Sequence, residues 1–361
     1  MSGLLRHVAR SISELARKWS EPVRKRCTGR SEAGIISRVF GRVTERVLSP
    51  EAWKSHVNNV LFLWNRNGLS YVFLYIGSDL FDLRLYERYS NGLRRLLNAD
   101  LMLVGVRDYE MIIDLTDTGI SKHLHLYGTW EHRSANVFEE ELSKLSVDGE
   151  DPIAVEIGAN IGYYTIMTEN AVEHEVDVVA IEPNSSNHEL LQKNIGINGI
   201  TDRVSVHRGA IGAESGTATL QLSSKSNLHR VEHDRVGQRG GGSETVPVWS
   251  LDGFLTEHGY EPHDVTSVRM DVEGYELEIL QGMKDVLGSD GPLLLYLEVH
   301  NNILNDEEIH EVLETLSDSG FEIRAVERGA NIVYPFEITV DANSWDDLAE
   351  VETAYSLFIR K

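Results

Sequence analysis

From Ile153 to the end of the chain, short apolar runs alternate with amphipathic segments, and this alternation constrains the fold more than any other feature. The apolar runs are typical of buried strands, and the amphipathic segments are typical of helices that cover them. The expected strands are Ile153–Ile157, Val176–Ile181, Val204–Val206, Val265–Met270, Leu293–Val299 and Phe321–Val326, with a last strand at Tyr355–Lys361. The expected helices are Gly162–Glu173, Ser186–Ile197, Tyr275–Leu287 and Asp306–Ser317. The sequence therefore predicts an α/β fold with a doubly wound, mainly parallel sheet, into which the last strand can insert antiparallel.

The first 50 residues have the opposite charge to the rest of the chain. They carry eleven Lys and Arg and four Glu, a net charge of 11 − 4 = +7, whereas the whole 361-residue chain has −23. Five apolar residues recur there at helical spacing, namely Leu5, Val8, Ile12, Leu15 and Trp19. This pattern predicts a basic amphipathic helical extension in residues 1–50, which either lies on an anionic membrane surface or packs against protein. Residues 51–95 look like a helical region, and residues 96–361 are expected to form a Rossmann-like domain.

Charge and composition argue against several classes of protein. The net charge of −23 argues against a nucleic-acid partner and favours adaptation to high salt, where charge repulsion is screened. The single cysteine, Cys27, rules out an intramolecular disulfide and fits a reducing compartment. No apolar run approaches the roughly 20 residues of a membrane span, and the N-terminus lacks a secretory signal. We therefore expect a cytoplasmic protein, at the inner face of the membrane if residues 1–50 bind lipid.

Two stretches interrupt the alternation of strands and helices. Residues Ser223–Glu244 are polar and rich in glycine, and residues Arg328–Glu350 read as a long irregular insertion. We expect the first to be a loop over the sheet edge. Loops in such positions commonly cover a substrate, although a plain connector would have the same composition.

The sequence EIGANIGYY follows the first expected strand and contains Gly158 and Gly162. Gly158 can adopt a positive φ and allows a ligand to approach the backbone, and Gly162 opens a helix whose N-terminus favours a carboxylate. Asn160 is a short polar cap between them. Tyr163 stands near the place where a pyrophosphate-binding turn has its third glycine. A plain strand-to-helix connection could carry the same glycines.

The next expected strand ends in an acid at the spacing that a ribose requires. Glu182 lies 182 − 158 = 24 residues after Gly158, close to the roughly 20-residue offset at which an acid meets ribose hydroxyls. Pro183 and Asn184 then shape the turn. Together with the glycine turn, this indicates a nucleoside with a charged tail rather than a diphosphate.

Acidic residues gather where the fourth expected strand gives way to a helix, in VRMDVEGYELEILQGM. Asp271, Glu273 and Glu276 repel one another unless a cation lies near them, such as the sulfonium of S-adenosylmethionine or a metal ion. Acids at a helix N-terminus have a simpler explanation in the helix dipole. The fifth strand ends in Glu298 and His300 at the same sheet edge, where a histidine can act as a general base or a metal ligand.

These motifs, in this order, resemble the FkbM family of S-adenosylmethionine-dependent methyltransferases. The matching segments are EIGANIGYYT, AIEPN, RGAIG, SLDGF, MDVEGYELEILQGM and LEVH, and they cover roughly Leu124 to Asn302. The resemblance implies a Rossmann-like class I methyltransferase fold and O-methylation, commonly of sugar or polyketide hydroxyls. The acidic charge adds the expectation of a halophilic archaeal source.

The resemblance also implies roles for single residues. The cofactor would be held by Glu156, Gly158, Ala159, Asn160, Gly162, Tyr163, Glu182, Pro183, Asn184, Ala210, Ile211, Asp271 and Glu273. In this set Glu182 would bind the ribose, Ala210 and Ile211 would flank the adenine, and Asp271 and Glu273 would face the methyl group. Tyr127 and Glu131 would close the site around the substrate.

Methyl transfer from a sulfonium is an in-line displacement in which the protein supplies alignment. We expect His300 to act as general base, oriented by Asp271 or Glu298. The alternative is a divalent metal held by Asp271, Glu298 and His300 that polarises the hydroxyl. A carboxylate acceptor would need no base, and a lipid-linked glycan precursor would suit a membrane-bound enzyme. The rival readings are a nicotinamide-dependent oxidoreductase and a non-catalytic nucleoside-binding protein at the membrane.

Overall fold

A computed structural model of the chain describes residues 69–75, 85–145, 152–172, 176–221, 230–231, 242–328, 344–351 and 353–361. The predicted amphipathic extension in residues 1–50 lies outside the described residues, as do most of residues 51–84 and much of the two interrupting stretches. Among the described residues, no helix has the length and apolar character needed to cross a membrane.

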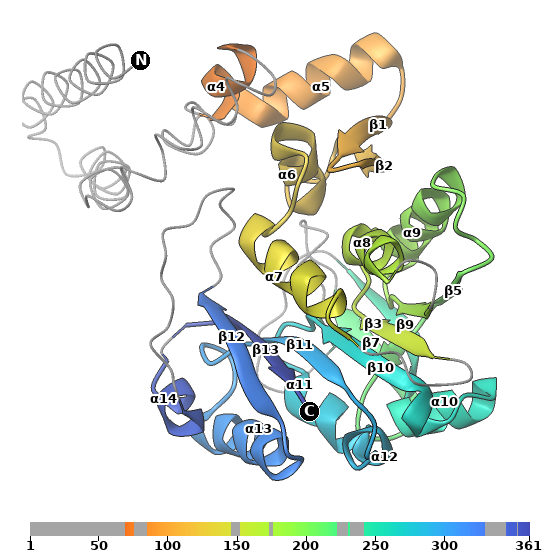
Figure 1. Cartoon of the computed structure of the whole chain (residues 1–361). Helices are drawn as coiled ribbons and strands as arrows, with labels where there is room; N and C mark the ends of the chain where they lie inside the picture. The colour runs from red at the N-terminus through yellow and green to blue at the C-terminus, as the bar shows by residue number, and fades with distance from the viewer. Residues whose placement is uncertain are drawn as a thin grey trace, which may run out of the picture.

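The described residues contain a seven-stranded sheet with the order β12-β13-β11-β10-β3-β4-β5 (Figure 1). Its strands are β3 (Ile153–Ile157), β4 (Asp177–Ile181), β5 (Val204–His207), β10 (Val265–Met270), β11 (Leu294–Val299), β12 (Glu322–Arg328) and β13 (Tyr355–Arg360). Strands β5, β4, β3, β10 and β11 pair in parallel, and β13 is antiparallel to both of its neighbours. The predicted doubly wound, mainly parallel sheet with an antiparallel last strand is confirmed.

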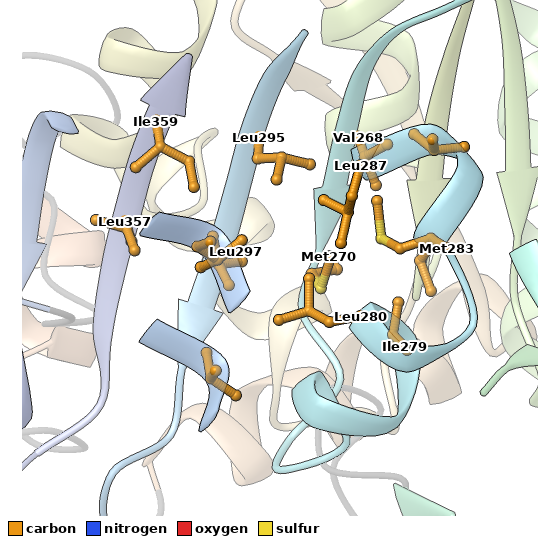
Figure 2. Packing of buried hydrophobic residues seen from close by; sticks show 14 of the residues in the cluster. Val268, Met270, Ile279, Leu280, Met283, Leu287, Leu295, Leu297, Leu357 and Ile359 are labelled. Atoms are coloured by element: carbon orange, nitrogen blue, oxygen red, sulfur yellow. The ribbon is translucent and has the colours of Figure 1, made fainter. Parts of the chain in front are cut away.

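Helices cover both faces of this sheet because successive strand residues point to opposite sides. On β11, Leu295 and Leu297 belong to one apolar cluster, whereas Leu294 and Tyr296 belong to another. The first cluster packs under α10 (Leu251–His258), α11 (Glu276–Gln281), α12 (Lys284–Leu287) and α13 (Asp306–Asp318). The second packs under α7 (His132–Leu142), α8 (Tyr163–Ala171) and α9 (Ser185–Ile197). Figure 2 shows Leu297 of β11 and Met270 of β10 among the side chains of the first cluster.

The expected helix Tyr275–Leu287 is wrong, because the structure has two short helices there, α11 and α12. They are separated at Gly282 and Met283. A Cβ on Gly282 would lie 2.0 Å from the carbonyl oxygen of Gly212, so the chain at residue 212 approaches too closely for any side chain. Glycine fits this contact and at the same time weakens the helix that contains it.

A second sheet, which we did not expect, has the order β6-β9-β7-β8. Its strands are β6 (Ala210–Ile211), β7 (Gly216–Gln221), β8 (Arg230–Val231) and β9 (Ser243–Trp249). The expected loop Ser223–Glu244 is therefore wrong at Arg230–Val231 and at Ser243–Glu244, which belong to strands. In the other interrupting stretch, α14 (Trp345–Ala349) is a short helix where we expected irregular chain.

Before the main sheet come α4 (Leu69–Tyr75), α5 (Leu85–Leu97), a hairpin of β1 (Leu101–Val106) and β2 (Tyr109–Asp114), and α6 (Ile120–Tyr127). The side chain of Asn194 on α9 accepts a hydrogen bond from the amide of Ile112 and donates to the carbonyls of Ile112 and Ile161. This buried amide joins the hairpin to the glycine turn. A short 3-10 helix, η3 (Pro262–Asp264), precedes β10.

Candidate functional site

The turn after β3 requires glycine at two positions. Gly158 has a φ of 79°, and a Cβ there would lie 2.5 Å from the carbonyl oxygen of Asp271. Gly162, at the N-cap of α8, has a φ of 93°, and a Cβ there would lie 2.7 Å from a methyl of Leu191. The amides of Gly158 and Ala159 both donate to the carbonyl of Ile181, at 2.9 and 3.0 Å. The turn is therefore pressed between the ends of β4 and β10, at the edge where doubly wound sheets bind ligands.

Glu182 links the turns that follow β3 and β4. Its two carboxylate oxygens accept hydrogen bonds from the amides of Asn160, at 2.8 Å, and Asn184, at 2.9 Å. Burial raises the pKa of Glu182 to about 7, against the opposing effect of these hydrogen bonds. The side chain of Asn187 donates a third hydrogen bond to Glu182, and because a carboxylate has about four lone-pair sites, about one remains for a hydroxyl donor of a ligand.

A cleft opens beside these turns. Of the residues that we expected to hold a cofactor, it is lined by Gly158, Ala159, Asn160, Tyr163, Glu182, Pro183, Ala210, Ile211, Asp271 and Glu273. Leu220 of β7 adds an apolar wall near Pro183 and β6, and Ile120 and Trp130 add apolar surface from the N-terminal side. The cleft therefore has apolar surface suited to a base, a carboxylate suited to ribose, and acids that favour a cation.

Three residues of the expected cofactor set lie behind the cleft. Glu156 is buried under the sheet edge and accepts a hydrogen bond from Thr168 at 2.8 Å. Burial raises the pKa of Glu156 to about 7. Asn184 caps α9, because its side chain accepts from the amide of Asn187. Together with Gly162, these residues shape the turns rather than line the cleft.

Tyr127 is not among the residues that line the cleft. Its ring packs edge-on against Tyr75, with centroids 6.3 Å apart, and it belongs to an apolar cluster with residues of α4 and α5. Trp130, which follows the end of α6, lines the cleft instead. The expectation that Tyr127 closes the site is therefore not supported by its position.

Arg269 on β10 lines the cleft and was not anticipated from the sequence. Its side chain is 4% exposed and its guanidinium carbon lies 3.7 Å from the ring centroid of Tyr164. Its nitrogens lie 3.3 Å from Asp271 and 3.9 Å from Glu156. A lone cation in an apolar strand is the signal that could have revealed it, because a buried charge requires partner charges.

Glu131, Asp271 and Glu298 form an acidic group, each with one carboxylate oxygen within 4.8 Å of the others. Glu131 accepts hydrogen bonds from the hydroxyls of Tyr164, at 3.0 Å, and Tyr296, at 3.3 Å. Burial, and next the charge of Asp271, raise the pKa of Glu131 to about 7 and that of Glu298 well above its ordinary value. Three carboxylates this close favour the uptake of a proton or a cation.

His300 is held by Glu276, which contradicts the expectation that Asp271 or Glu298 orients it. Its Nδ1 lies 2.6 Å from a carboxylate oxygen of Glu276, whose side chain is fully buried. Burial lowers the pKa of His300, but the hydrogen bond and charge of Glu276 outweigh it and raise this pKa to about 10. A ring that carries a proton at neutral pH cannot take another, so this geometry does not suit His300 as general base.

Part of the chain matches a known family of domains. Residues 156–323 match the model of the methyltransferase FkbM domain. The chain is also similar to the hexuronic acid methyltransferase AglP of Haloferax volcanii, with 29% identity over 173 residues. That alignment covers 46% of this chain and 64% of AglP, so the chain spans less than two thirds of its relative's length.

Three solved structures match this chain at low sequence identity. The methyltransferase FkbM of Methylobacillus flagellatus KT is 14% identical with a TM-score of 0.36, covering 65% of this chain and 52% of that one. The M. jannaschii tRNA m1G37 methyltransferase is 14% identical with a TM-score of 0.36, covering 73% and 54%. M. jannaschii TYW2, solved in complex with AdoMet, is 13% identical with a TM-score of 0.35, covering 72% and 84%.

Proposed function

We propose that this chain, which carries a methyltransferase FkbM domain of the class I fold over residues 156–323, methylates a hydroxyl of a sugar in a glycan precursor. The donor is S-adenosylmethionine, as the family implies. The observation that carries the proposal is Glu182, whose carboxylate joins the glycine turn to the turn after β4 at one wall of the cleft.

The residues of the cleft fit the parts of this cofactor. Glu182 keeps an acceptor site for a ribose hydroxyl. Ala210, Ile211 and Leu220 give the adenine an apolar surface, and the positive-φ turn at Gly158 admits the methionine part where a Cβ would block it. Asp271 and Glu273 are anionic surface for the sulfonium. When bound, the cofactor supplies an electrophilic methyl group.

The acidic group Glu131, Asp271 and Glu298 supports a hydroxyl acceptor. A neutral hydroxyl must lose its proton during methyl transfer, and carboxylates at the edge of the site are suited to accept it. We assign that proton to Glu131, whose pKa of about 7 lets its carboxylate take up a proton at neutral pH. Asp271 instead pairs with the guanidinium of Arg269, 3.3 Å away.

A sugar acceptor is favoured by the relative AglP, whose name gives hexuronic acid as its substrate. The direct test is incubation of the purified protein with methyl-labelled S-adenosylmethionine and oligosaccharides with and without hexuronic acid. We expect label in the sugar, retained after mild alkali because ethers resist it. Release of the label by alkali would assign the methyl to the carboxylate as an ester, and no labelled sugar would argue against this acceptor class.

The basic segment in residues 1–50 suggests that the protein meets its acceptor at a membrane surface. Its net charge of +7 and its apolar repeat suit an anionic membrane surface, where lipid-linked saccharides lie. Deletion of residues 1–50 should release the protein from vesicles of anionic lipid in a flotation assay. Equal binding by the shortened and full chains would remove the segment as the anchor.

A further inference from the structure

We propose that Asp271, Glu273 and His300 form a divalent-cation site at the acceptor end of the cleft. In the described part of the chain, one ligand atom from each of the three lies within 4.8 Å of the others. Bonds of about 2.1 Å to one ion place opposite ligand atoms about 4.2 Å apart, so only a small closure would bring the three together. Asp271 and Glu273 line the cleft, which gives the ion access to a ligand there.

The observation that distinguishes this group from a mere cluster of acids is the second ring nitrogen of His300. Its side chain is 6% exposed, and Nε2 has no hydrogen-bond partner within the described residues. The nearest carboxylate oxygens, of Glu273 and Glu298, lie at 3.9 and 4.0 Å, beyond hydrogen-bond reach. A nitrogen of a largely buried side chain that lies about 4 Å from two carboxylates suits a shared ion rather than a direct hydrogen bond.

Glu276 supplies the support that a metal-bound histidine ordinarily has. A ligating imidazole usually donates its other N–H to a carboxylate, which fixes the ring and its tautomer, and a cation bound at Nε2 displaces the proton that this nitrogen otherwise carries. Here Nδ1 faces Glu276 at 2.6 Å, and Glu276 itself accepts from the amide of Gly274 at 3.1 Å. The ring is therefore held so that Nε2 points toward Glu273 and Glu298. Glu276 is a positioning residue for this site.

The second acidic group, Glu131, Asp271 and Glu298, shares Asp271 with the proposed site. One cation beside Asp271 would therefore lower the repulsion between the carboxylates of both groups. The donor set of one imidazole and several carboxylates suits Mn²⁺ or Mg²⁺ better than the thiolate-rich sites typical of softer metals.

The role of the ion rests on the proposed function. Bound to the acceptor hydroxyl, the cation would increase its acidity, and the proton would pass to water or to a carboxylate of the edge. The oxygen then forms a bond to the methyl carbon while the carbon–sulfur bond breaks, and the electron pair of that bond stays on sulfur to give a thioether. No oxidant or reductant is needed.

The test is a titration of Mn²⁺ into the full chain in the absence of S-adenosylmethionine. Binding is measured by the loss of the free Mn²⁺ signal in electron paramagnetic resonance. We expect one tight site in the wild type, weakened by at least about tenfold in Asp271→Asn and His300→Ala. Glu276→Gln should weaken Mn²⁺ binding by about 10- to 100-fold, because Glu276 acts only by holding the imidazole ring of His300 in place. Glu257→Gln and His310→Ala, both exposed, are matched controls and should bind as the wild type does.

A second readout needs no variant to fold. Electron spin echo spectroscopy of the wild-type complex should show coupling of Mn²⁺ to one imidazole nitrogen. Absence of a site at millimolar Mn²⁺, or a site that the three variants leave unchanged, or no nitrogen coupling, would overturn the proposal. Calorimetric titration of S-adenosylmethionine without Mn²⁺ separates the two claims, since binding there supports the proposed function whatever the metal does.

Discussion

Gly158 shows how one residue ties the turn to the neighbouring strand. Its φ of 79° and the 2.5 Å from a Cβ to the carbonyl of Asp271 exclude any side chain. Gly158→Ala should lower the free energy of unfolding by about 1–3 kcal/mol and weaken cofactor binding. Urea denaturation measures the first effect. Gly196→Ala, inside α9 with no atom within 4 Å of its Cβ, should raise stability by about 0.5–1 kcal/mol. Equal stability of the two variants would contradict this account.

At the residue scale, the groups that the sequence predicted well are those that follow strand ends. Glu182 and Asp271 line the cleft because carboxyl ends of parallel strands meet at one edge. Arg269 and Leu220 could not be placed in the same way. Arg269 lies within a strand, and its role depends on rings from α8 and β11, while Leu220 depends on a sheet that the sequence did not reveal. The partner of His300 was misassigned because Glu276, on α11, reaches it from 24 residues away in the sequence.

At the scale of elements, the strands of the main sheet were predicted to within two residues, and β3, β4 and β11 stand out because burial on both faces makes them mostly apolar. The second sheet was missed although TATLQ and ETVPVW carry some alternation, because one strand pair is interrupted by a long polar stretch. The split of α11 from α12 depends on the chain at Gly212, which is far away in sequence. Contacts of this kind leave no local periodicity to read.

The three helices α4, α5 and α6 meet at His125, which makes their packing sensitive to pH. The ring nitrogens lie 3.1 Å from the hydroxyls of Tyr71 and Tyr86, and burial lowers the pKa of His125 to about 4. Since the unfolded histidine titrates near pH 6.5, acidification from there toward pH 4 protonates the unfolded chain first. The contribution of His125 is therefore present above about pH 6.5 and is lost as pH falls, by up to about 3 kcal/mol.

Urea denaturation at neutral pH and near pH 5 measures this loss. The variant His125→Gln should be less stable at neutral pH but should lose less stability on acidification than the wild type. His310→Gln, at an exposed position on α13, is the control and should keep the wild-type response. An acid response of His125→Gln equal to that of the wild type would rule out His125 as its source.

At the scale of the whole molecule, charge should make stability depend on salt. A net charge of −23 repels itself strongly in dilute buffer, whereas at 1 M salt the Debye length is only about 3 Å. We expect the melting temperature to rise as KCl is increased from about 0.1 M to molar concentrations. Differential scanning calorimetry measures it. A melting temperature that stays constant over this range would contradict adaptation to high salt.

The most direct test of the central claim is calorimetric titration of S-adenosylmethionine into the full chain in molar salt. We predict binding by the wild type and an affinity about 10- to 100-fold lower in Glu182→Ala, which loses charged hydrogen bonds worth about 1.5–3 kcal/mol. The control Glu257→Ala, on the exposed surface of α10, should bind as the wild type does. No binding by folded wild-type protein, or equal binding by Glu182→Ala, would contradict the placement of the cofactor between the glycine turn and Glu182.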